Sequence, residues 1–93
     1  MALHFEWDTT KRQENLAKHG VDFMRAVAIF AAPVAVFADD RFDYGEDRRI
    51  AIGFVDADCY VVVHTMRDDV MRIISARLGG RRDRRKYHAY FAR

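Results

Sequence analysis

The residues of this chain best suited to chemistry are arginines, and most of them lie in its last third. Arg67 ends one strand-like run, and Arg72 and Arg77 belong to the next. From Arg77 onward the chain has seven basic side chains and one acidic side chain, whereas the residues before it have nine basic and thirteen acidic ones. A planar guanidinium matches two oxygens of a phosphate and keeps its charge. This polarity indicates a nucleic acid, RNA or DNA, as the first partner to consider.

Cleavage of RNA without a metal ion needs three contributions from a protein. The ribose 2′-hydroxyl must lose a proton, the charged intermediate must be stabilised, and the departing 5′-oxygen must gain a proton. We expect Arg67 and Arg77 to stabilise and position RNA phosphates, with Lys18 adding charge from a helix end. The competing interpretation is that both arginines are solvated and paired with nearby aspartates. They lie at opposite ends of neighbouring strands, so they need not touch.

The groups for proton transfer are harder to assign. His19 follows Lys18, and an imidazole exchanges protons near neutral pH, but a cation at a helix end also stabilises the terminal carbonyls. Glu46 is a candidate base or an ion-pair partner of Arg48, and we favour the ion pair. His64 points to the opposite face of its strand from Arg67, which favours a structural role for this histidine. Charge stabilisation and substrate positioning alone would also explain why no clear acid–base pair is present.

The basic tail is expected to form a helix over Arg81–Phe91, after a break at Gly79–Gly80. Its cationic residues surround more than one face, and they are Arg81, Arg82, Arg84, Arg85 and Lys86. Such a run ordinarily serves solubility, but like charges four residues apart destabilise a helix, so this excess favours an anionic partner. Tyr87 and Tyr90 are expected to be part of the packing stripe of this helix rather than platforms for bases.

Capping residues and periodicity predict the helices that position the site. Asp8 is placed to cap a first helix that ends before Gly20, with Leu16 as an inner contact. Asp22 repeats the capping device for a second helix with an apolar stripe, and Pro33 ends it.

Residues rich in β-branched and apolar side chains predict five strands, within 3–7, 34–38, 49–55, 60–66 and 71–76. Short polar turns join the last three into an antiparallel meander. Alternation along the final strand places Arg72 on the face opposite Met71, Ile73 and Arg77. The expected fold is α+β, in the order β-α-α-β-β-β-β-α, with the helices on one face of a curved, mainly antiparallel sheet.

Composition limits the remaining possibilities. With 93 residues and a 51% hydrophobic content, the chain is expected to form a single domain over residues 1–93. Cys59 is the single cysteine, so no disulfide forms within the chain, and we expect a half-buried thiol. No apolar run is long enough for a membrane span, which suggests a cytoplasmic protein. The acids of residues 39–47 are expected to be a solvated loop, and no metal or cofactor motif is present.

The sequence resembles the BrnT toxins of bacterial type II toxin–antitoxin systems, which are similar to RelE-type ribonucleases. The resemblance lies in FEWD (Phe5–Asp8), KHGV (Lys18–Val21), FAAP (Phe30–Pro33), GEDRRIAIG (Gly45–Gly53), VVVHTMR (Val61–Arg67), RIISAR (Arg72–Arg77) and RRDRRKY (Arg81–Tyr87). The chain departs from the family at Gly80, where many relatives carry threonine or serine, and at Leu78, where arginine is common.

This resemblance implies a RelE-like fold, an endoribonuclease that arrests translation, and neutralisation by a DNA-binding antitoxin of the BrnA type. Operator DNA would be reached only through the antitoxin, because the chain has no helix-turn-helix pattern. Two other functions use the same arginines: a nucleic-acid-binding module without catalysis, and an interaction subunit whose basic tail binds an acidic helix of a partner. Cleavage of naked RNA without added metal distinguishes the enzyme from both.

Overall fold

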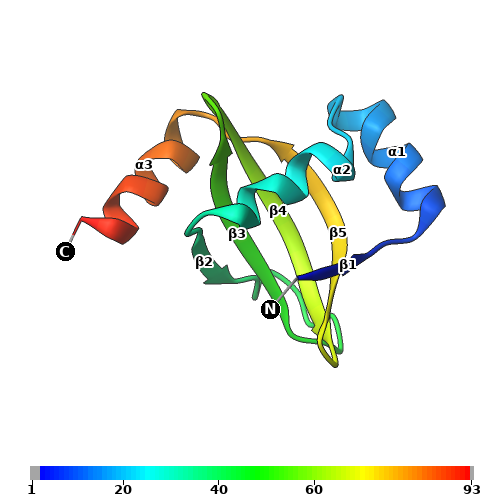
Figure 1. The fold of residues 1–93 in the computed structure, drawn as a ribbon. Helices are drawn as coiled ribbons and strands as arrows, with labels where there is room; N and C mark the ends of the chain where they lie inside the picture. Colours follow the sequence, from blue (N-terminus) through cyan, green and yellow to red (C-terminus); the bar gives the residue numbers. More distant parts are fainter. Residues whose placement is uncertain (1–2, 93) are drawn as a thin grey trace.

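The computed structural model describes residues 3–92, which form three α-helices, a short 3₁₀ helix and five strands. Along the chain these are β1 (His4–Glu6), α1 (Thr9–His19), α2 (Phe23–Ala26), the 3₁₀ helix η1 (Val27–Ala31), β2 (Ala35–Ala38), β3 (Arg48–Val55), β4 (Asp58–Arg67), β5 (Val70–Leu78) and α3 (Arg81–Phe91). The strands form one mixed sheet in the order β1-β5-β4-β3-β2, in which β1 runs parallel to β5 and the other neighbours are antiparallel (Figure 1). The α+β class is confirmed. None of the helices in this part of the chain is both long and apolar enough to cross a bilayer.

The predicted helix caps are present. Asp8 accepts a hydrogen bond from the N–H of Lys11 at 3.0 Å, and Gly20 closes α1 in the left-handed region with φ of +69°. Asp22 accepts from the N–H of Met24 at 3.1 Å. The second helix is shorter than predicted, because α2 has four residues and continues as the 3₁₀ helix η1. Proline restricts the residue before it to extended backbone, so Pro33 prevents a longer helix.

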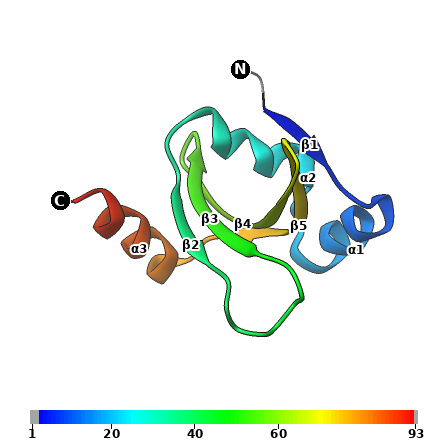
Figure 2. The same cartoon turned by 90° about the horizontal axis from the view of Figure 1, so that it is seen from below.

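The sheet curves around α2, which gives it a concave and a convex face (Figure 2). The concave core is formed by the segment that leads into α2, by α2 and η1, and by β3, β4 and β5: Val21, Phe23, Ala26, Ile29, Ala51, Tyr60, Val62, Met71, Ile73 and Ala76. On the convex face, α3 packs on a second cluster: the ring centroids of Tyr87 and Phe54 are 4.9 Å apart, and those of Tyr90 and Phe37 are 5.5 Å apart. The expectation that all helices cover one face is therefore wrong, because the aromatic stripe of α3 finds its partners on the other. Cys59 lies in this cluster and is fully buried rather than half-buried.

A buried asparagine joins α1 to the sheet. The Asn15 amide donates to the carbonyl oxygens of Ala76 at 2.7 Å and Val21 at 3.0 Å, and its oxygen accepts from the N–H of Ala76 at 3.1 Å. Because β1 pairs only with residues 70–72 of β5, these bonds satisfy backbone groups farther along the same edge. The bonds of Asn15 hold the last turn of α1 beside β5. Leu16, which was predicted to be an inner contact, is instead 48% exposed.

Strand β5 contains a β-bulge at Ile74. Val63 of β4 pairs with Ser75, but the next residue of β4, His64, pairs with Ile73. Ile74 is therefore an extra residue, and the alternation of side chains reverses beyond it. The uninterrupted alternation predicted for this strand is wrong.

Candidate nucleic-acid interface

The bulge at Ile74 places the arginines of β5 on the same face of the sheet. Arg72 pairs with Thr65, and Arg77 pairs with Val61. Cross-strand partners point to the same side, and both partners alternate with the concave-core residues of β4, so both arginines lie on the convex face. The prediction that they lie on opposite faces is wrong, since it assumed a regular strand. Arg67, the last residue of β4, also lies on the convex face.

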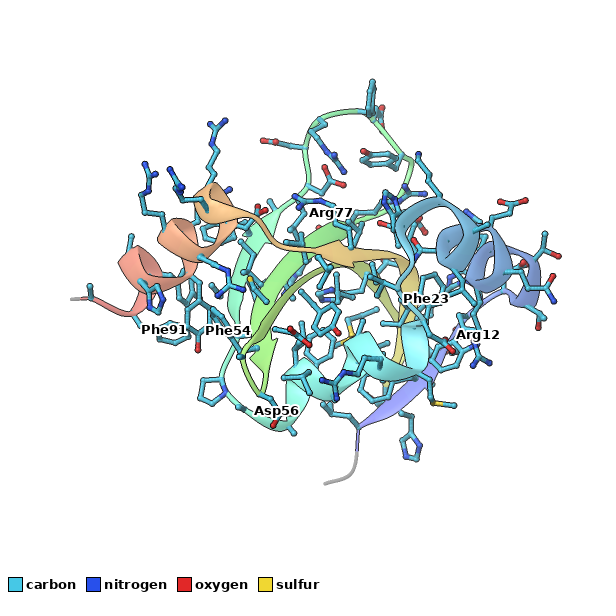
Figure 3. The ribbon with its side chains drawn as sticks, turned by 90° about the horizontal axis from the view of Figure 1, so that it is seen from above. Arg12, Phe23, Phe54, Asp56, Arg77 and Phe91 are labelled. Carbon is cyan, nitrogen blue, oxygen red and sulfur yellow. The ribbon has the colours of Figure 1, made fainter. Side chains whose placement is uncertain are left out.

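A cleft of about 330 Å³ lies on the convex face between the end of α1 and the start of α3. Its floor is apolar and comes from β3 and β4: Ile50, Ile52, Val61 and Val63. Its walls carry Lys18, His19, Arg41, Arg77 and Lys86. Figure 3 shows Arg77 on the strand between the two helices. A cleft with cationic walls and an apolar floor suits a phosphodiester with its attached sugar or base.

Arg77 is held at the wall of this cleft by Asp83. Two guanidinium nitrogens donate to the two carboxylate oxygens at 2.9 and 3.2 Å. Asp83 also accepts from the N–H of Gly80 at 2.9 Å and so caps α3, which Gly80 cannot do with a side chain. The hydrogen bond from Arg77 holds the pKa of Asp83 below its ordinary value. The side chain of Arg77 remains 47% exposed, so it is oriented by one carboxylate and open to a second anion.

Lys18 and His19 reach the cleft from the last turn of α1. Both are exposed, and within residues 3–92 neither side chain has an ion-pair or hydrogen-bond partner. They lie three and four residues beyond Asn15, whose hydrogen bonds to β5 determine where this turn lies. The cleft thus brings together Lys18, His19 and Arg77, three of the residues that the sequence singled out.

Arg67 and Glu46 lie at the other end of the sheet. One oxygen of Glu46 accepts from Arg48 at 3.0 Å, and the other lies 3.8 Å from Arg67. The expected ion pair with Arg48 is confirmed, and its hydrogen bond lowers the pKa of Glu46. Arg67 is six residues along β4 from the partner of Arg77, which corresponds to roughly 20 Å at ~3.3 Å per residue. The two arginines therefore do not meet at one phosphate.

The other arginines predicted to bind RNA lie on β5 and α3. Arg72 forms an ion pair with Glu6 at 3.4 Å. Arg84 lies over the ring of Phe54, 5.4 Å from its centroid. Three other arginines of α3 are exposed and have no charged partner in the described part of the chain: Arg81, Arg82 and Arg85. They are available to an external polyanion, and Arg72 and Arg84 are already engaged.

Sequence reasoning did not place two cationic residues at this site, although it named Lys86 as part of the basic tail. Lys86 lies three residues after Asp83, so helical spacing from that acid could have identified it. Arg41 belongs to a loop without periodicity, and no local pattern indicates its position. Arg41 donates to Asp39 at 2.7 and 2.8 Å, and the Asp39 side chain is completely buried rather than solvated as expected. His64 is buried on the concave side, and this burial lowers its pKa and so favours the uncharged form. Its burial agrees with the prediction of a structural histidine.

Chemically, the cleft offers permanent positive charge, one imidazole and the carboxylate of Asp83, which is paired with Arg77. Arginine and lysine stabilise the charge that develops on a phosphate in the transition state. His19 is the only cleft residue whose side chain ordinarily exchanges protons near neutral pH. Among residues 3–92, no three carboxylate, imidazole or thiol groups lie together in a way that could hold a metal ion.

Comparisons with known proteins agree with this chemistry. Residues 7–83 match the family described as "Ribonuclease toxin, BrnT, of type II toxin-antitoxin system". A similar solved structure is that of the Brucella abortus ribonuclease toxin BrnT, with a TM-score of 0.70 and 30% sequence identity over 86% of this chain and 100% of that chain. A comparison with curated proteins gave no match.

Proposed function

Because this chain belongs to the BrnT family of ribonuclease toxins of type II toxin–antitoxin systems, we propose that it cleaves RNA in the convex cleft. The observation that carries this proposal is the meeting of Lys18, His19 and Arg77 in one cleft, although α1 and β5 are far apart in sequence. These residues supply two cations for a phosphate and one group for proton transfer.

In the proposed reaction the phosphate binds between Lys18 and Arg77. The ribose 2′-oxygen loses its proton, attacks phosphorus and forms a 2′,3′-cyclic phosphate, while the bond to the 5′-oxygen breaks and that oxygen takes a proton. His19 carries protons in these steps, and the two cations stabilise the additional negative charge of the intermediate. The cations occupy the electrostatic role that a metal ion has in other nucleases, so the reaction is proposed to be metal-independent.

The RNA is proposed to continue along the convex face in both directions. Arg67, roughly 20 Å from Arg77 by strand register, binds a phosphate of the same strand. Glu46 orients Arg67 and Arg48, and its lowered pKa makes it a weak base at neutral pH. Toward α3 the free arginines at 81, 82 and 85 add phosphate contacts.

The family assignment also implies an antitoxin partner. We propose a DNA-binding antitoxin of the BrnA type, which neutralises the toxin and connects it to operator DNA. We propose that the α+β fold of this chain is RelE-like. The toxin is proposed to arrest translation in the cytoplasm.

The test is cleavage of purified total RNA in EDTA by the wild type, by Arg67→Ala/Arg77→Ala and by Arg49→Ala. Arg49 is a matched control, because its side chain is 54% exposed and its pairing with His64 places it on the concave side. The wild type and Arg49→Ala are expected to cleave RNA and leave 2′,3′-cyclic phosphate ends, and the double variant is expected to be inactive. Wild-type protein that binds RNA and leaves it intact would indicate a binding module instead.

A further inference from the structure

The loop of residues 39–47, between β2 and β3, extends from the sheet on the side away from α2 (Figure 2). Phe42 lies in this loop and is 71% exposed, the highest value among the exposed large hydrophobic residues of the described chain. A single exposed phenylalanine is common on protein surfaces, but this one directly follows Arg41, a residue of the cleft wall, and so can contact a ligand bound there.

The loop is held by several polar contacts rather than by an apolar core. At its start, the Asp39 N–H donates to the Arg48 carbonyl at 2.9 Å, and the Asp39 carboxylate accepts two hydrogen bonds from Arg41. At its end, the Thr65 hydroxyl donates to the Asp47 carbonyl at 2.7 Å. These contacts involve residues on both sides of Phe42 and leave its ring outside.

One face of the neighbouring aromatic ring is already occupied. The guanidinium of Arg48 lies 4.0 Å from the centroid of the Tyr44 ring, and the rings of Tyr44 and Phe42 meet edge to face at 5.8 Å. Tyr44 therefore packs against Phe42, and the Phe42 side chain, which is 71% exposed, remains accessible to another planar group.

Phe42 directly follows a residue of the cleft in the sequence. Arg41, the preceding residue, lines the cleft wall together with Lys18 and Arg77. A polyanion that follows these cations with its backbone directs its bases outward, and aromatic side chains beside a basic groove bind unpaired bases by stacking.

We propose that Phe42 stacks on an unpaired base next to the phosphate bound in the cleft, an inference that rests on the proposed ribonuclease function. Phe42 is then a positioning residue that makes the enzyme select single-stranded RNA. A base in a duplex is already stacked on both sides and cannot reach the ring.

The test uses short single-stranded 2′-O-methyl RNAs, which cannot be cut because the attacking hydroxyl is blocked, with 2-aminopurine replacing each base in turn. Wild-type protein is expected to quench the fluorescence at one position. Phe42→Ala is expected to lose this quenching and to bind about 5- to 150-fold more weakly. Phe42→Trp is expected to restore both, and Phe91→Ala, a half-exposed phenylalanine at the end of α3, to leave both unchanged.

A second readout separates positioning from chemistry. Phe42→Ala is expected to keep the wild-type cleavage rate at saturating RNA and to show a raised KM. Equal binding of RNA by Phe42→Ala and wild type, or an equal loss of binding to duplex RNA, would overturn the stacking inference and leave the ribonuclease intact. Failure of the wild type to bind any RNA would overturn the inference together with the proposed function.

Discussion

Arg77 provides the sharpest test of the cleft, because its partner in the free protein can be changed independently. Arg77→Ala removes a guanidinium that makes a two-point contact with Asp83 at 2.9 and 3.2 Å and can offer the same geometry to phosphate. A hydrogen bond to a charged group contributes about 1.5–3 kcal/mol. Loss of one such bond in the transition state lowers kcat/KM by roughly 10- to 150-fold.

The assay measures kcat/KM on a fluorogenic RNA for Arg77→Ala, Arg77→Lys, Asp83→Asn and Arg49→Ala. Arg77→Lys keeps the charge without the planar fork, so an intermediate loss is expected. Asp83→Asn keeps the guanidinium and an oxygen that can cap α3, but it removes the competing carboxylate. This variant is therefore expected to cleave at least as fast as the wild type, and Arg49→Ala to cleave at the wild-type rate.

Two results would refute this reasoning. Wild-type activity in Arg77→Ala would show that its guanidinium does not contact the reacting phosphate. An equal loss of activity in Asp83→Asn and Arg77→Ala, accompanied by an equal loss of folded protein, would show that the ion pair matters only for folding. Circular dichroism of each variant separates these effects from unfolding.

Urea unfolding tests three further predictions. Because Arg77 lowers the folded-state pKa of Asp83, their ion pair stabilises the fold above the unfolded-state pKa of about 4 and loses this effect as the pH falls through the folded-state value. Asp83→Asn is thus expected to be about 0.5–1 kcal/mol less stable at pH 7 and to match the wild type in strong acid; a constant difference would contradict this. Asn15→Ala leaves both backbone groups of Ala76 without their partner and is expected to cost about 2–4 kcal/mol, so an unchanged midpoint would exclude a structural role. A Cβ at Gly79 would lie 2.5 Å from the Cys59 sulfur, so Gly79→Ala is expected to cost about 1–3 kcal/mol, and Cys59→Ala in the same chain to recover part of it; no recovery would place the strain elsewhere.

Local chemistry explains why much of the fold could be predicted. Asp8 and Gly20 mark helix ends through their own hydrogen bonds and backbone freedom, and both act as predicted. Asp56 and Asp68 adopt φ of 55° in the two hairpin turns, a conformation that aspartate tolerates better than most residues. These features depend on a few neighbouring residues, so a single sequence contains them.

Features that depend on distant residues could not be predicted. The bulge at Ile74 adds one residue to a run of alternating side chains, and nothing in that run distinguishes the extra residue. The inward position of Asn15 depends on an unpaired strand edge more than sixty residues away, at Ala76. The cleft depends on both the bulge and the hydrogen bonds of Asn15. Its residues could therefore be proposed one by one from the sequence, but their meeting in one cleft could not be predicted. The separation of Arg67 from Arg77 is different, since it follows from the hairpin register and could be predicted from the sequence.

The central claim is that RNA binds in the convex cleft. The most direct measurement is the change in backbone amide NMR shifts when a single-stranded 2′-O-methyl RNA is added to the wild-type protein. The largest shifts are predicted at Lys18, His19, Ser75 and Arg77. Shifts confined to the apolar groove between β1 and α2, which is lined by Leu3, Phe5, Met24 and Val27 among others, would contradict the account.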